Sequence, residues 1–266
     1  MKFDFWNIGW RSVRRGIFHM ACAAALSLPG ASALSQAVTA AEKPFVWGVD
    51  GEPTNYGNRW VTLIYREAFR RLGIPVQFEH YSLARRAALV EEGVIDGETS
   101  RIYSYGDSRP NLVRVEEPLA DLVFSFFTAN PSLRLARIED MRGTGYRVEY
   151  RRGILLCETA VKGVVAAEQI SDVLTQGQGL KKLIAGRTDL YCDLEVYVLQ
   201  ELQQPEFKGA NVRKVVSIGK TVPTYPYVNK KHAELAPRLA AVLKQMKAEG
   251  LIEVYRKQVE RDLGWQ

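Results

Sequence analysis

Residues that could carry out catalysis are sparse in this 266-residue chain. Its three histidines, His19, His80 and His232, do not stand at metal-ligand spacing from one another or from a cysteine. No Gly-x-Ser-x-Gly elbow supplies a serine nucleophile, and no glycine pair completes a phosphate-binding fingerprint. A carboxylate can still act as a general acid without a motif. The sequence therefore favours binding over catalysis, and we expect no metal and no cofactor.

Polar side chains that could hold a small anion follow or flank the predicted strands. Arg101 is the strongest candidate, because a guanidinium can grip a carboxylate through two parallel hydrogen bonds. Arg85, just inside a predicted helix, is a second candidate. Gly153 opens a helix whose free backbone amides could bind the same kind of group. The alternative for each arginine is an ordinary solvated position on the surface.

Three further side chains could contact the rest of a ligand. Tyr56 could supply an aromatic floor or a hydroxyl donor, and Glu52 or Asp193 could accept hydrogen bonds from an ammonium group. The alternative for Tyr56 is a loop aromatic ring that packs against its own part of the protein. The alternative for Glu52 and Asp193 is a carboxylate that caps a nearby backbone amide. Ligands of α/β sheets bind beyond the carboxyl ends of the strands, so these segments are expected to meet at one place.

The N-terminus has the order of features of a secretory signal. Basic residues between positions 11 and 15 precede an apolar run at 16–28, and the small residues 31–33 follow it. We predict a signal peptide over residues 1–33, with cleavage after residue 40 as the alternative, and a mature protein in the periplasm. An N-terminal membrane anchor or a buried helix is the competing interpretation, although the run is short for a bilayer.

Removal of that segment changes the arguments from charge and from cysteine content. Without residues 1–33, which hold four basic side chains and one acidic, the formal net charge falls from +6 to about +3, too small to indicate a nucleic-acid partner. Two cysteines remain, Cys157 and Cys192. In an oxidising compartment they could form a disulfide, and two small buried thiols are the equally weighted alternative.

Hydrophobic periodicity predicts alternating strands and helices. The first part of the chain is predicted to form strand 45–49, loop 50–58, helix 61–72, strand 76–79, helix 83–92 and a further strand that starts at 94–96. The second reads as strand 145–150, helix 154–162, helix 180–185 and strand 189–192, and two helices at 235–250 and 252–259 end the chain. This order indicates largely parallel sheets with crossover helices.

A short sequence motif occurs once in each of these two parts of the chain. In one, a helix ends at Gly93 and an aspartate, Asp96, follows three residues later; in the other, the pair is Gly186 and Asp189. Glycine tolerates the left-handed conformation that ends a helix. With the matching order of elements, the repeat indicates two lobes of similar construction.

Several segments together resemble the bacterial extracellular solute-binding proteins of family 3, the amino-acid type. The matching segments, in chain order, are Val46-Trp-Gly-Val-Asp50, Gly93-Val-Ile-Asp-Gly97, Pro118 through Phe127, Ile138-Glu-Asp-Met-Arg-Gly143, Gly186-Arg-Thr-Asp189 and Leu243 through Tyr255. The resemblance implies a two-lobed α/β periplasmic-binding-protein fold of type II. Lobe 1 would comprise residues 43–127 and 225–266 and lobe 2 residues 128–224, joined by a two-segment hinge.

The resemblance also bears on the site and the partners. Arg109 has a spacing to Pro118 like that of the family's carboxylate-binding arginine. Where the family has Gly followed by Thr at the start of the helix that Gly153 opens, this chain has Gly153 followed by Ile154 and Leu155. The resemblance therefore does not imply the family's usual contacts to an α-amino acid. The implied function is capture of a small polar, carboxylate-bearing or amino-acid-like ligand by a monomer that delivers it to an ABC permease. The alternatives are a sensing module for a membrane receptor and a lyase similar to cyclohexadienyl dehydratases.

Overall fold

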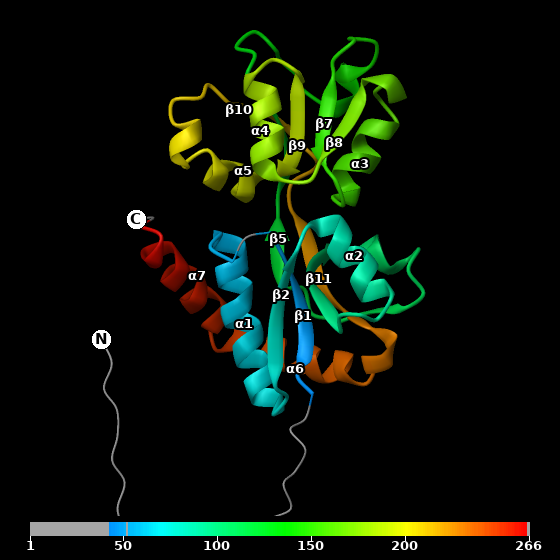
Figure 1. Ribbon diagram of the computed structural model, residues 1–266, viewed down its shortest axis with the longest axis vertical. Helices are drawn as coiled ribbons and strands as arrows, with labels where there is room; N and C mark the ends of the chain where they lie inside the picture. The colour runs from blue at the N-terminus through cyan, green and yellow to red at the C-terminus, as the bar shows by residue number, and fades with distance from the viewer. Residues whose placement is uncertain (1–42, 52, 265–266) are drawn as a thin grey trace, which may run out of the picture. The chain divides into compact units, whose positions relative to one another are not determined.

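The computed structural model describes residues 43–51 and 53–264, which fold into two α/β lobes (Figure 1). The predicted signal peptide and the candidate Glu52 lie outside the described residues. Each lobe has one sheet with helices packed against it. The two-lobed α/β architecture expected from the sequence is therefore confirmed.

Lobe 1 is built on a six-stranded sheet of order β2-β1-β3-β11-β4, with β5 paired to β11. β1, β2 and β3 are parallel, whereas β11 runs antiparallel to β3, β4 and β5. The elements of lobe 1 are β1 (Phe45–Asp50), α1 (Tyr56–Leu72), β2 (Val76–Tyr81), α2 (Leu83–Glu91), β3 (Gly97–Ile102), β4 (Leu112–Arg114), β5 (Ala120–Leu122), β11 (Val222–Asn229), α6 (Leu235–Ala248) and α7 (Leu251–Asp262).

Lobe 2 repeats this plan with a five-stranded sheet of order β10-β6-β9-β7-β8. β7, β8 and β9 are parallel, and β6 and β10 are antiparallel additions. The elements of lobe 2 are β6 (Phe124–Thr128), β7 (Val148–Arg151), α3 (Leu155–Lys162), β8 (Ile170–Val173), α4 (Gln176–Ile184), β9 (Leu190–Leu194), α5 (Glu195–Glu201) and β10 (Arg213–Ser217). The expected parallel arrangement thus holds for the three helix-connected strands of each lobe, and the antiparallel strands are those that enter or leave a lobe.

The chain crosses between the sheets slightly earlier than the expected boundary at residue 127. β5 pairs with β11 in lobe 1, whereas β6, which begins at Phe124, pairs with β9 and β10 in lobe 2. The return crossing precedes β11, which begins at Val222 rather than at residue 225. The two crossings lie side by side as the connections between the lobes (Figure 1). The positions of these crossings depend on which strands pair through their backbones. The pattern of side chains along the sequence does not reveal that pairing.

Local signals explain where the first helix begins. We expected a loop through residue 58, but α1 begins at Tyr56 because Asn55 acts as its N-cap. The side-chain oxygen of Asn55 accepts a hydrogen bond from the backbone N–H of Asn58 at 2.8 Å. At the other end, Gly73 adopts a left-handed conformation with φ of 71° and stops the helix, as predicted.

The cores alternate across the two faces of each sheet. In lobe 2, Phe126 and Cys192 face a cluster with α3, whereas their chain neighbours Phe127 and Tyr191 face a second cluster with α4 and α5. This follows from the two-residue period of a strand. Lobe 1 has the same layering, with α1 and α6 on one face of the sheet and α2 on the other.

The repeated glycine and aspartate phrase has the same role in both lobes. Asp96 accepts a hydrogen bond from the backbone N–H of Val46 at 2.7 Å, and Asp189 accepts one from Arg147 at 2.8 Å. Val46 is the second residue of β1, and Arg147 immediately precedes β7. Each aspartate therefore fixes the N-terminal end of β1 or β7. β3 begins at Gly97, just after the segment 94–96 at which we expected this strand to start.

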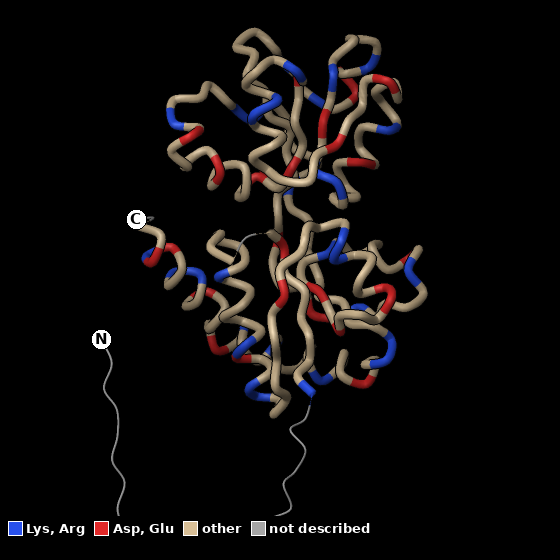
Figure 2. Tube along the Cα trace, in the orientation of Figure 1, with Lys and Arg blue, Asp and Glu red and all other residues tan. Residues whose placement is uncertain are grey.

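Two further features concern covalent linkage and charge. Cys157 of α3 and Cys192 of β9 form a disulfide beneath the α3 face. Basic and acidic side chains are interspersed along both lobes (Figure 2). Within the described residues, no helix combines the length and apolar character needed to cross a membrane.

Candidate functional site

A small cavity of about 50 Å³ lies where the carboxyl ends of the parallel strands of the two lobes meet. It is lined by residues of both lobes: Asp50, Leu83, Arg86, Thr99, Ser100, Arg101, Ile102, Tyr105, Leu122, Phe124, Arg151, Gly153, Ile154, Leu155, Leu156, Leu194 and Tyr197. Three of these are arginines, and most of the others are apolar. Within the described residues, no cluster of three or more His, Cys, Asp or Glu side chains could hold a metal ion.

Arg86 supplies a spare hydrogen-bond donor at this cavity. Its side chain is 1% exposed, its Nε lies 3.0 Å from Glu98 Oε2, and its Nη2 donates to the carbonyl of Thr99 at 3.3 Å. Within the described residues, Nη1 is buried and has no partner. Burial, and then the nearby Arg101, lower the pKa of Arg86. Burial of a guanidinium with an unused N–H group costs free energy, because the donor has lost its hydrogen bonds to water. A ligand that brings a hydrogen-bond acceptor would restore that hydrogen bond.

Arg101 is buried as well, but each of its nitrogens already has a protein partner. Nε and Nη2 lie 2.8 and 2.5 Å from Glu98 Oε2, and Nη2 also donates to the carbonyl of Leu83. Nη1 reaches across to the carbonyl of Gly153 in lobe 2 at 3.4 Å. The guanidinium lies 4.5 Å from the centre of the Tyr105 ring. Arg101 therefore lines the cavity and is held in place by contacts with both lobes.

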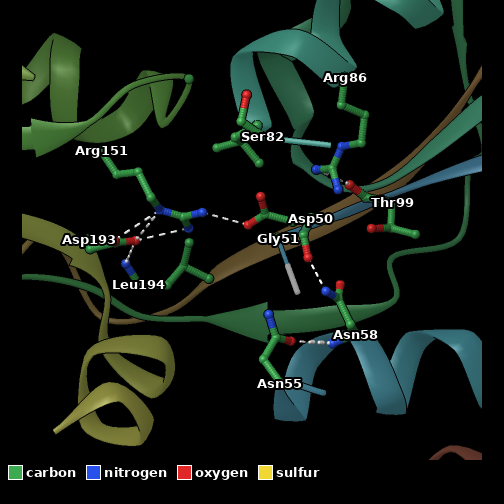
Figure 3. Close-up of polar contacts among 12 residues, drawn as sticks. Asp50, Gly51, Asn55, Asn58, Ser82, Arg86, Thr99, Arg151, Asp193 and Leu194 are labelled. Carbon is green, nitrogen blue, oxygen red and sulfur yellow. Dashed lines mark hydrogen bonds and ion pairs between the residues drawn. The ribbon is translucent and has the colours of Figure 1, made fainter. Parts of the chain in front are cut away.

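Arg151 joins two carboxylates across the lobes (Figure 3). Its Nε and Nη2 bind Asp193, the nearest contacts being 2.9 and 3.0 Å, and its Nη1 donates to Asp50 Oδ2 at 2.5 Å. Burial acts to raise the pKa of Asp50, but the attraction of Arg151 outweighs it together with that of Arg86 and Arg101, so the pKa is lowered. Burial raises the pKa of Asp193 despite its contact with Arg151.

The N-terminus of α3 faces the same cavity. Gly153 adopts φ of 92°, and no side chain caps the helix at Ile154. The first turn of a helix leaves its backbone N–H groups without intrahelical partners, and Leu155 and Leu156 of that turn line the cavity. The helix end therefore adds partial positive charge beside Arg86 and Arg101.

The backbone of β3 shows strain at the cavity. Ser100 has φ of 55°, in the left-handed region that a serine seldom adopts. It lies next to Arg101 and lines the cavity. Such conformations cost roughly 1–3 kcal/mol and are found most often at functional sites.

The other predicted residues lie elsewhere. Arg85 is exposed and Arg109 packs on Tyr105, with 4.1 Å between its guanidinium and the ring centre. Tyr56 lies at the start of α1, where its backbone N–H donates to Gln200 of lobe 2 at 3.2 Å. Asp193 is buried and bound to Arg151, which lines the cavity. None of these four side chains lines the cavity, which leaves Arg101 and Gly153 as the predicted residues that do.

Three charged lining residues were not among the predicted binding residues, namely Arg86, Arg151 and Asp50, although Arg151 is close to the predicted Gly153. A signal for Arg86 was present: it is three residues after the buried Leu83 and three before the buried Leu89, so it shares their helix face. Arg85 is displaced from that face by one residue, which is about 100° around a helix. Asp50 is the last residue of β1 and Arg151 is the last residue of β7.

The sequence comparison establishes a family. No family model matches the chain. A protein from Shewanella oneidensis, named only as an uncharacterized protein, is 34% identical over 238 residues, which is 85% of this chain and 89% of that one. The chain belongs to the same family as this Shewanella protein.

The comparison with solved structures establishes the fold. A histidine kinase sensor domain with similarity to periplasmic binding proteins has a TM-score of 0.67 at 19% identity, over 81% of this chain and 95% of that one. An ancestral arginine-binding protein bound to arginine has a TM-score of 0.66 at 18% identity, over 82% of this chain and 98% of that one. The substrate-binding protein of an amino acid ABC transporter has a TM-score of 0.67 at 13% identity, over 82% of this chain and 100% of that one. The fold is the two-lobed periplasmic-binding-protein fold, and these neighbours are binding or sensing proteins rather than enzymes.

Proposed function

We propose that this protein is a periplasmic solute-binding protein that captures a small carboxylate-bearing or amino-acid-like solute between its lobes and delivers it to an ABC importer. The observation that carries the proposal is the spare Nη1 donor of Arg86, buried beside a cavity that the α3 N-terminus also lines. Both features supply hydrogen-bond donors at the lining of one small cavity, and together they suit a carboxylate.

The position of the cavity supports a binding role. It is lined from both lobes, and direct contacts join the lobes around it, including Arg101 to Gly153 and Arg151 to Asp50. Two-lobed proteins of this kind close around a ligand. A ligand that contacts both lobes favours the closed state by its additional contacts there.

A sensing role is the second candidate, and a specific observation favours it. The histidine kinase sensor domain has the same TM-score as the amino acid transporter component. The binding chemistry would be the same in both roles, and only the membrane partner would differ. Uptake of the identified ligand by a strain lacking this protein separates them: reduced uptake supports transport, and wild-type uptake with loss of a ligand response supports sensing.

The binding function is tested by a thermal-shift screen of the purified protein against amino acids, small carboxylates, polyamines and sugars. A ligand that binds only the folded state stabilises it by RT ln(1 + [L]/Kd), about 2.7 kcal/mol at a hundredfold excess over Kd. We expect carboxylates to raise the melting temperature. If no carboxylate or amino acid does so, the proposal is wrong.

A matched pair of variants locates the site. Arg86→Gln removes the buried donor, while Glu98 keeps Arg101 as its partner. We expect this variant to bind the ligand roughly tenfold to a hundredfold more weakly, as for a lost hydrogen bond to a charged group. Arg85→Gln alters the adjacent, exposed arginine and should bind normally. Equal affinity of the two variants would place the carboxylate elsewhere.

A further inference from the structure

We infer that the ligand is a short 2-oxo or 2-hydroxy acid, with a carboxylate but no ammonium group. The inference rests on the proposed binding function and narrows its ligand class. It depends on how Arg151 occupies the carboxylates that an ammonium group would need.

Asp193 has no acceptor capacity left for a ligand. Its Oδ1 accepts from Arg151 Nη2 at 3.0 Å and from the backbone N–H of Leu194 at 2.7 Å. Its Oδ2 accepts from Arg151 Nε at 2.9 Å and from the Tyr191 hydroxyl at 2.5 Å. A carboxylate offers about four lone-pair positions. The guanidinium of Arg151 therefore takes the place at Asp193 that a ligand ammonium would otherwise fill.

Asp50 is the only carboxylate among the described residues that line the cavity, and Arg151 binds it too. The other charged lining residues are Arg86, Arg101 and Arg151. An ammonium group at Asp50 would compete with Arg151 for that carboxylate and lie among guanidinium groups, where like charges repel.

The charges of the cluster balance before any ligand binds. Arg86 and Arg101 share Glu98, and Arg151 is bound by Asp50 and Asp193. Among the described residues that line the cavity, the buried side-chain groups without a partner are Nη1 of Arg86 and the hydroxyl of Tyr105, and both can donate. Glu98 Oε1 has no partner either, but Glu98 does not line the cavity. The uncapped start of α3 adds partial positive charge. The cavity therefore favours a single negative charge over a zwitterion.

The other lining residues suit a ligand with a short, largely apolar chain and one oxygen besides its carboxylate. Thr99, Ser100 and Tyr197 bring hydroxyl groups, which can donate to a keto oxygen or accept from a hydroxyl. The apolar lining residues are Leu83, Ile102, Leu122, Phe124, Ile154, Leu155, Leu156 and Leu194. The cavity of about 50 Å³ is small beside the roughly 150 Å³ that accommodates benzene in an engineered core. A three-carbon acid matches this size best.

The test compares acids that differ only at the second carbon. Calorimetric titration of the full chain with pyruvate, L-lactate and L-alanine covers the short series, and 4-methyl-2-oxopentanoate with L-leucine covers a longer one. We expect the oxo or hydroxy acid to bind at least tenfold more tightly than its amino partner, with the short series tighter than the long. Equal or tighter binding of the amino acids would overturn the inference and leave the proposed function intact. Failure of every acid to bind would count against both.

A substitution of Arg151 tests the cause of the selectivity. Arg151→Met frees Asp50 and Asp193, so the preference for pyruvate over L-alanine should fall at least tenfold. Arg152→Met is the control, because Arg152 is exposed and pairs with Asp172 outside the cavity; it should keep the wild-type preference. If Arg151→Met does not fold, the comparison of acids on the wild-type protein still decides the inference. An unchanged preference in folded Arg151→Met would show that Arg151 does not set it.

Discussion

Arg151 and Asp50 occupy equivalent places in the two lobes and bind each other. Asp50 ends β1 and Arg151 ends β7, each strand being the centre of a parallel group ordered β2-β1-β3 or β8-β7-β9. Their side chains meet at 2.5 Å between Oδ2 and Nη1, and both are buried. The internal repeat thus brings two strand ends together, and opposite charges at those ends connect the lobes.

Removal of the Arg151 charge should destabilise the protein strongly. In Arg151→Met, Asp193 keeps its burial and loses its cationic partner, which we expect to lower the free energy of unfolding by about 3–5 kcal/mol. Arg152→Met should leave the free energy of unfolding close to that of the wild type, because its ion pair with Asp172 is exposed. Urea unfolding of the two variants provides the comparison, and similar losses in both would argue against a buried charge cluster.

The contact between Asp50 and Arg151 should resist acid. The pKa of Asp50 is lowered from its ordinary value of 3.8, so its ionised form is stabilised by folding. Its contribution is therefore fully present above pH 3.8 and is lost as the pH falls through the lower folded value. The difference in unfolding free energy between the wild type and Asp50→Asn should stay constant from neutral pH down to about pH 5 and shrink only below the ordinary pKa. A difference that disappears near pH 6 would contradict this assignment.

Gly153 should not tolerate a side chain. Its φ of 92° is unfavourable for alanine, and an added Cβ would lie 3.1 Å from the backbone nitrogen of Ala84 in lobe 1. We expect Gly153→Ala to cost about 1–3 kcal/mol in unfolding free energy from strain alone and to weaken ligand binding. Gly163→Ala, at the other end of α3 in open space, should be neutral or slightly stabilising. Wild-type stability and affinity in Gly153→Ala would show that the lobes do not approach so closely.

The disulfide should be present in the purified protein kept without reductant and should stabilise it. Peptide mapping by mass spectrometry without reduction should recover a peptide that links Cys157 to Cys192. The bond closes a loop of 35 residues, and chain entropy predicts a contribution of about 4 kcal/mol for such a loop. The double variant Cys157→Ala/Cys192→Ala should unfold at a lower urea concentration. Two unlinked thiol peptides would reject the bond.

The sequence determined the order of elements and the two-lobed fold, because these depend on local periodicity and on glycine. The predicted ends of α1 at Gly73 and of α2 before Gly93 follow from left-handed glycines. The recurrence of Gly93 with Asp96 and Gly186 with Asp189 correctly indicated similar lobes, because each aspartate fixes a strand in the same way. Arg101 and Gly153 were also placed at the cavity by the rule for strand ends.

Only the tertiary structure decided which charged groups are free to bind. Asp193 follows a predicted strand and was a natural acceptor for a ligand, but Arg151, 42 residues away in the chain, binds it. Arg85 and Arg86 are adjacent in sequence, and helix rotation exposes one and buries the other. Burial and pairing between distant residues depend on packing, whereas a sequence pattern reports only local geometry. The charge pairing of this cavity therefore became visible only when the two lobes were assembled.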